Sequence, residues 1–210
     1  MEWQAATPLL FAAVIGFGHA FEADHLLAVS SIVTRRRHWR QAALDGIWWG
    51  LGHTSTILVV GLLLIVGRVS FDIDIFDRLE ALVGLMLIGL GLWRLYDFRR
   101  QRDQPAARDD AQQPHMAYGV GLVHGLAGSG AIVVLVMSKL SSIAESLAFL
   151  LIFGIGSVVG MWLAASLFSL PFSKRLNATA WLQWGLGILS SVLCIGYGAW
   201  IVWEKAGFAG

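Results

Sequence analysis

The sequence predicts an all-α integral membrane protein with six transmembrane helices, built as a 3+3 inverted repeat with both termini outside. Of the 210 residues, 57% are hydrophobic and only 14% are charged, and the mean hydropathy is +0.68. An average soluble domain carries about 25% charged residues. The chain therefore has too few polar side chains to cover a water-soluble globule of its size.

Six apolar stretches are long enough to cross a bilayer, which takes about 20 predominantly apolar residues of helix. They cover residues 8–33, 43–67, 76–98, 117–137, 145–170 and 181–203. Only short segments separate them, so the sequence leaves no room for a separate soluble domain.

Lys and Arg residues set the expected orientation of these stretches. Ten of them follow the first, third and fifth stretches, and four lie at the opposite ends. Because basic residues are enriched in cytoplasmic loops, we expect the arginine-rich segments in the cytoplasm. Four further ionisable residues near span ends are expected to reach headgroups or water: Asp45, Glu80, Arg94 and Glu145.

The polar, mixed-charge segment 99–115 contains two prolines and is typical of a flexible cytoplasmic linker. It divides the chain into a first half, residues 1–98, and a second half, residues 116–210. A faint repeat supports this division. GHAFEADHLLAV aligns with VHGLAGSGAIVV, WGLGHT with FGIGSV, and GLGLW with GYGAW, at offsets of 105, 104 and 107 residues. Because each half has three spans, the second half would enter the membrane inverted, as in many secondary transporters.

Several function classes are disfavoured by what the sequence lacks. A net charge of +1 offers no basic excess for nucleic-acid binding. The single cysteine, Cys194, cannot form an intrachain disulfide or a Cys-x-x-Cys redox pair. No G-x-x-x-x-G-K-[ST] phosphate loop is present, so we expect no ATP hydrolysis by this chain.

Six ionisable residues lie in the apolar stretches away from their ends and are the candidate site: His19, Glu22, Asp24, His25, His53 and His124. A carboxylate at the bilayer centre costs about 2.5 to 3.5 kcal/mol even on the lenient insertion scale. Two carboxylates and two histidines within seven residues are hard to explain by packing alone. For His53 and His124, a role as interhelical hydrogen-bond partners stays open.

Helix geometry predicts that most of these side chains meet. On an ideal helix, His19, Glu22 and His25 spread over about 120° of one face, whereas Asp24 joins them only if the helix is distorted. Gly16 and Gly18 would favour such a distortion. His25, His53 and His124 lie about 12, 15 and 10 Å from the cytoplasmic ends of their stretches, so these three can meet at one depth.

Imidazoles with one or two carboxylates are the donors chosen by Ni(II), Co(II), Cu(II) and Zn(II). A dication would also neutralise the buried carboxylates. The alternatives are an intramembrane zinc enzyme, although the H-E-x-x-H motif is absent, and a haem protein, which carboxylates beside the histidines disfavour. A divalent metal exporter is a further alternative.

The motif HAFEADH, His19 to His25, resembles the first signature of the nickel/cobalt transporter family, and LGHTST, Leu51 to Thr56, is similar to the second. With Glu22 and the segment HGLAGSG, which starts at His124, the chain resembles the short, urease-associated UreH-like branch of nickel permeases. Longer members of the family have eight spans and a third, Asp-rich signature, which we do not find in this sequence.

This resemblance implies a secondary transporter that takes up Ni(II) or Co(II) across the cytoplasmic (inner) membrane. It implies metal-handling roles for His19, Asp24, His25 and His53. We expect no resident cofactor, because the metal ion is the transported substrate. The expected partners are the divalent ion, the lipid bilayer and, functionally, urease or another nickel enzyme.

Overall fold

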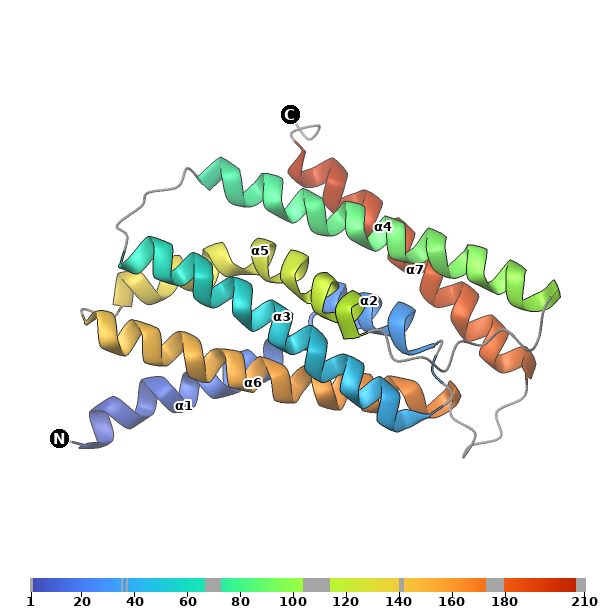
Figure 1. Ribbon diagram of the computed structural model, residues 1–210. Coiled ribbons are helices and arrows are strands. Elements are labelled where there is room, and N and C mark those ends of the chain that lie inside the picture. The colour runs from blue at the N-terminus through green and yellow to red at the C-terminus, as the bar shows by residue number, and fades with distance from the viewer. Residues whose placement is uncertain are drawn as a thin grey trace.

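The chain folds into a bundle of long helices in a computed structural model (Figure 1). The structure describes residues 2–34, 36, 38–66, 73–103, 114–139, 142–172 and 180–206. Their elements, in chain order, are α1 Glu2–His19, α2 Ala23–Val33, α3 Trp39–Ile65, α4 Ile73–Asp103, α5 Pro114–Lys139, α6 Ile143–Ser169, the 3₁₀ turn η1 Leu170–Phe172 and α7 Ala180–Lys205.

The first apolar stretch is interrupted, where a continuous helix was expected over residues 8–33. Helix α1 ends at His19 and α2 begins at Ala23. The amide of Phe21 donates to the Gly18 carbonyl at 2.9 Å, and Glu22 is extended, with φ −65° and ψ 155°. Neither Pro nor Gly occupies residues 20–22, and the two glycines upstream lie inside α1. The break therefore falls at residues that are not themselves helix breakers, directly after the glycine-containing end of α1.

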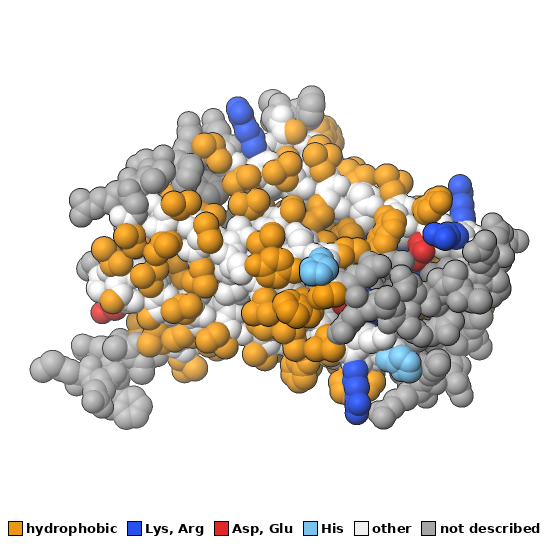
Figure 2. All heavy atoms as spheres, viewed as in Figure 1, with side chains coloured by type: hydrophobic (Ala, Val, Ile, Leu, Met, Phe, Trp, Pro, Cys, Tyr) orange, Lys and Arg blue, Asp and Glu red, His pale blue; other side chains and the backbone are white. Residues whose placement is uncertain are grey.

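Four helices of the described residues are long and apolar enough to cross a membrane: Trp39–Ile65, Arg78–Arg100, Ile143–Phe172 and Trp181–Lys205. The two pieces of the broken stretch, Thr7–His19 and Ala23–Val33, are shorter apolar helices. Large hydrophobic side chains lie exposed along the bundle, and Figure 2 shows them covering much of one face. Because soluble monomers seldom expose so much contiguous apolar surface, the protein is a multi-pass membrane protein.

The helices pair across the two halves of the chain. Helix α3 packs against α5 and α6, α1 against α6, and α4 against α7, which run together along one side in Figure 1. Glycines permit the closest approaches. A Cβ on Gly16 of α1 would overlap the Phe153 carbonyl of α6, and one on Gly121 of α5 would overlap the Trp49 carbonyl of α3.

Two further glycines permit the same two helix crossings, each from the other helix of its pair. A Cβ on Gly52 of α3 would overlap the Tyr118 carbonyl of α5, and one on Gly156 of α6 would overlap the Ala13 carbonyl of α1. Small residues at such crossings let two backbones approach closely in a membrane. The crossings α1–α6 and α3–α5 are therefore both built on glycine from each side.

Two residues expected to reach headgroups or water are instead buried in ion pairs. Arg36 donates from Nε to Asp45 Oδ2 at 2.6 Å and from Nη2 to Asp45 Oδ1 at 3.1 Å. Arg94, only 1% exposed, donates to the Thr34 carbonyl at 2.9 Å and to Asp97 at 3.2 Å. The expectation for Asp45 and Arg94 was wrong, because each contacts a residue that sequence spacing does not place beside it.

Parts of the expected linker are helical. Residues 99–103 belong to α4 and residues 114–115 to α5, while residues 104–113 lie outside the described residues. The described ends that adjoin the arginine-rich segments lie together at one end of the bundle, on the right in Figure 1. Several basic residues used for the orientation lie outside the described residues: Arg35, Arg37, Arg68, Arg108, Lys174 and Arg175.

Candidate metal centre

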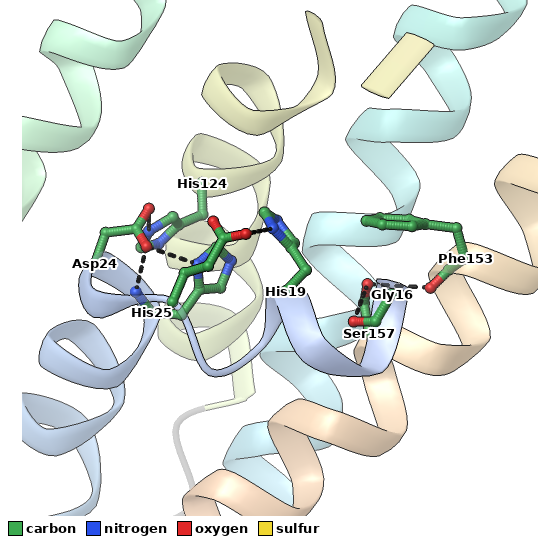
Figure 3. Close-up of polar contacts among 8 residues, drawn as sticks. Gly16, His19, Asp24, His25, His124, Phe153 and Ser157 are labelled. Carbon is green, nitrogen blue, oxygen red and sulfur yellow. Dashed lines mark hydrogen bonds and ion pairs between the residues drawn. The ribbon is translucent and has the colours of Figure 1, made fainter. Parts of the chain in front are cut away.

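The break between α1 and α2 lies in the middle of the bundle and gathers the candidate residues. His19 is the last residue of α1, and His25 lies in the first turn of α2. His53 comes from the middle of α3 and His124 from the middle of α5. All four histidines are buried, and the three drawn in Figure 3 lie close together around the break.

The four imidazoles form one cluster with His25 at its centre. The His25 ring centroid lies 4.5 Å from that of His19, 5.2 Å from that of His53 and 4.3 Å from that of His124. The rings of His19 and His53 are 5.2 Å apart. The structure thus brings His25, His53 and His124 together, as the helix rise predicted for these three, and adds His19 to them.

Asp24 connects two of the imidazoles. Its Oδ1 lies 3.0 Å from His25 Nδ1 and accepts the His25 backbone amide at 2.8 Å, and its Oδ2 lies 3.2 Å from His124 Nε2 (Figure 3). A continuous helix would have turned the Asp24 carboxylate away from the cluster. Because the helix is interrupted and α2 begins a new one, the carboxylate reaches the cluster.

Glu22 contacts a ring nitrogen of His19, as Asp24 does for His25. Its Oε1 lies 2.9 Å from His19 Nδ1, and its side chain is 57% exposed. A carboxylate on one ring nitrogen fixes the imidazole orientation and the tautomer, leaving the lone pair of the other nitrogen for a metal. The arrangement therefore presents Nε2 of His19 and of His25 as metal donors.

The remaining ring nitrogens are buried without a hydrogen-bond partner. They are His19 Nε2, His25 Nε2, His124 Nδ1 and both nitrogens of His53. Buried polar atoms are normally hydrogen-bonded, so these unpartnered ring nitrogens on facing helices are candidate ligands for a metal ion. Two groups of the described residues offer ligand atoms within 4.8 Å of one another: His19 with His25 and His53, and Asp24 with His25 and His124.

Aromatic rings enclose the cluster. Trp49 stacks on His25 at 5.5 Å and lies 5.6 Å from His124, and Phe153 lies 5.6 Å from His19. A cavity of about 460 Å³ reaches the histidines from the other side. Aromatic rings and a cavity thus both border the histidine cluster.

Comparison with known proteins identifies the family. The chain is 34% identical over 171 residues to the urease accessory protein UreH of Bacillus sp. strain TB-90, covering 76% of this chain and 75% of that protein. The chain belongs to the nickel/cobalt transporter family. Its members are transport proteins, not enzymes.

Further relatives of this nickel/cobalt transporter have lower coverage or identity. A high-affinity nickel transport protein of Cupriavidus necator is 30% identical over 41% of this chain and 25% of that protein. A Methanocaldococcus jannaschii protein provisionally named a nickel/cobalt efflux system is 25% identical, with 70% and 69% coverage. No family profile and no solved structure matches the chain.

Sequence reasoning missed the enclosing aromatics of this transporter. Trp49 and Phe153 belong to no metal-binding motif. The internal repeat, however, pairs WGLGHT with FGIGSV and so aligns these two residues. The same repeat aligns His19 with His124. The His19 ring lies 5.6 Å from Phe153, and the His124 ring lies 5.6 Å from Trp49. The internal repeat was therefore the signal that could have found the two aromatic residues.

Proposed function

We propose that this chain is a secondary transporter that carries Ni(II) inward across the cytoplasmic membrane, with the buried histidine cluster as its transport site. The observation that carries the proposal is the group His19, His25 and His53. Their ligand atoms lie within 4.8 Å, and each contributes a buried ring nitrogen without a partner.

The donor chemistry supports a borderline dication. Three imidazoles without thiolates suit Ni(II), Co(II), Cu(II) or Zn(II) better than soft ions. The carboxylates of Asp24 and Glu22 hydrogen-bond to ring nitrogens rather than facing one another. They offset the charge of the ion and hold the ligands. Three protein donors leave coordination positions open, which lets an ion enter and leave by ligand exchange.

We further propose that the halves 1–98 and 116–210 form an inverted repeat. Gly16 and Gly121 are 105 residues apart, and the residues whose carbonyls they approach, Phe153 and Trp49, are 104 apart. The crossings α1–α6 and α3–α5 are then two copies of one contact. The pairs α3–α6 and α4–α7 each join a helix to its counterpart in the other half of the repeat. Repeats of this kind commonly place the transport site at their interface.

The two ends of the bundle differ in their access to the histidine cluster. At the arginine-rich end, Arg36 and Asp45 join the α2 exit to α3, and Arg94 joins α4 to Thr34. The cavity instead reaches the cluster from the side of Glu80 and Lys205, near the start of α4 and the end of α7. With arginine-rich segments in the cytoplasm, this cavity would open to the outside, which is the state in which an importer loads its ion.

The names of the relatives suggest a destination for the ion. One is a urease accessory protein and another, of Bradyrhizobium diazoefficiens, a hydrogenase nickel incorporation protein. We infer that imported Ni(II) supplies a nickel enzyme of the same cell.

Transport into proteoliposomes of defined orientation tests the function. Ni(II), Co(II), Zn(II) and Mn(II) are supplied singly and in competition, with and without a pH gradient. We expect saturable Ni(II) uptake that His25→Ala abolishes and His115→Ala, at an exposed histidine, retains. Ni(II) movement only from the arginine-rich face would overturn inward transport, and equal uptake by wild type and His25→Ala would overturn the site.

A further inference from the structure

The cavity beside the histidine cluster runs from a buried wall to a half-exposed mouth. The wall carries His19, His25 and His124, all less than one-tenth exposed. The mouth carries Glu80 of α4 together with Glu204 and Lys205 of α7. Glu80 is 36% exposed and Lys205 29%, and Glu204 is exposed. Buried imidazoles and solvent-accessible charged side chains therefore line one and the same cavity.

The charges that line the cavity are strongly unbalanced. Four carboxylates line it, those of Glu22, Asp24, Glu80 and Glu204, against the single ammonium of Lys205. A cleft lined by one sign of charge within low-dielectric walls concentrates counter-ions and raises their association rate. The histidines at its inner wall have unpartnered ring nitrogens, so the cations that it concentrates meet metal donors at its end.

We propose, resting on the proposed function, that this cavity is the access path of the divalent cation and that Glu80 and Glu204 form an outer cation site at its mouth. Lys205 is the exchangeable counter-ion of that site. Its Nζ lies 2.8 Å from Glu80 Oε2 and joins α7 to α4 across the opening. An arriving hydrated dication replaces the ammonium at Glu80 and then passes to the histidines.

Glu22 is the intermediate carboxylate on this path. It lines the same cavity, is more than half exposed and contacts His19 Nδ1 at 2.9 Å. A dication therefore meets carboxylate oxygens at the mouth and beside His19 before it meets nitrogen donors. An outer site of oxygens alone binds Ni(II) more weakly than imidazoles, and conduction requires a first site that releases the ion.

The kinetics of uptake test the outer site separately from the buried one. We compare Glu80→Gln, Lys205→Gln and the control Glu145→Gln for Ni(II) uptake into proteoliposomes. Glu145 is an exposed carboxylate in the first turn of α6, outside the cavity. Glu80→Gln is expected to raise KM about threefold to tenfold through lost steering, with kcat retained and a weaker dependence on ionic strength. Lys205→Gln is expected to lower KM.

Two outcomes separate this proposal from the proposed function. If Glu80→Gln and Lys205→Gln leave KM at the Glu145→Gln value while His25→Ala abolishes uptake, the outer site is wrong and the transport site stands. If His25→Ala also transports normally, both are wrong. A general effect of surface charge would move KM equally in Glu80→Gln and Glu145→Gln, and this too would overturn the outer site.

A thiol at the inner end of the path gives a readout that does not depend on transport. Ala127 lines the cavity, and the native cysteine, Cys194, is buried. We expect Ala127→Cys to react with a membrane-impermeant methanethiosulfonate from the side of Glu80, and Ni(II) to slow the reaction. Reaction only from the arginine-rich side, or no protection by Ni(II), would overturn the access path.

Discussion

His124 Nε2 lies 3.2 Å from Asp24 Oδ2, which joins the middle of α5 to the first turn of α2 across 100 residues of sequence. The other oxygen of the same carboxylate holds His25. One carboxylate therefore contacts two imidazoles from opposite halves of the chain, and the geometry of the candidate site depends on how these halves meet.

Replacing Asp24 by Asn tests this connection. Asn keeps the shape of the side chain but removes the charge and one acceptor oxygen, so His25 loses the partner that fixes its tautomer. Second-shell substitutions of this kind cost about 10- to 100-fold in metal affinity. We expect a loss of that size in Ni(II) affinity by isothermal titration calorimetry. An unchanged dissociation constant would mean that Asp24 does not support the site.

We expect His53 to lower the stability of the metal-free protein while it supplies a ligand for the metal ion. Both of its ring nitrogens are buried without a partner, and an unsatisfied buried polar group costs about 1–3 kcal/mol. We expect His53→Leu to melt at the wild-type temperature or above it without metal, and to lose the rise in Tm that Ni(II) gives by binding the folded state. His115→Leu, at an exposed histidine, should retain that rise. A destabilised His53→Leu protein that still responds to Ni(II) would contradict the assignment.

Neighbouring glycines of α1 differ sharply in the room around them. A Cβ at Gly16 would overlap the α6 backbone, whereas one at Gly18 meets nothing within 4 Å. Overpacking costs about 1–3 kcal/mol, so Gly16→Ala should lower Tm in detergent and Gly18→Ala should not. The repeat predicts the same contrast for Gly121→Ala and Gly119→Ala of α5. Equal Tm values within either pair would contradict the close helix crossing.

The buried pair of Arg36 and Asp45 should dominate stability at the arginine-rich end. Removing one partner of a buried ion pair leaves an uncompensated charge and costs about 3–5 kcal/mol. We expect Asp45→Asn to unfold at markedly lower denaturant than wild type, and Arg36→Met with Asp45→Leu to recover part of the loss. Were Asp45→Asn as stable as Glu145→Gln, the ion pair would not hold this end together.

The histidine cluster could be predicted from sequence, and its carboxylate geometry could not. His19, His25, His53 and His124 stand out because charge and polarity are rare in the apolar stretches, and helix rise places the last three at one depth. The position of Asp24 depends on a break that residues 20–22 do not encode locally. Propensity describes a chain segment alone, whereas the Asp24–His124 contact and the packing of α2 against α4, α6 and α7 are tertiary.

The same limit applies to the ends of the bundle. Because Arg94 lies near a span end, its position in the sequence predicted a side chain in water. Its guanidinium instead donates to the Thr34 carbonyl and lies 4.0 Å from the Phe98 ring centroid. Partners separated by many residues follow from helix packing, which no local pattern gives. The repeat was the exception, because it relates distant residues directly, as it does His19 and His124.

Nickel K-edge X-ray absorption of the purified protein, loaded with one equivalent of Ni(II), tests the central claim most directly. The account predicts multiple scattering from at least two imidazole rings around one nickel ion, lost in His25→Ala and retained in His115→Ala. Coordination by oxygen alone in the wild-type protein, or an unchanged imidazole signal in His25→Ala, would contradict it.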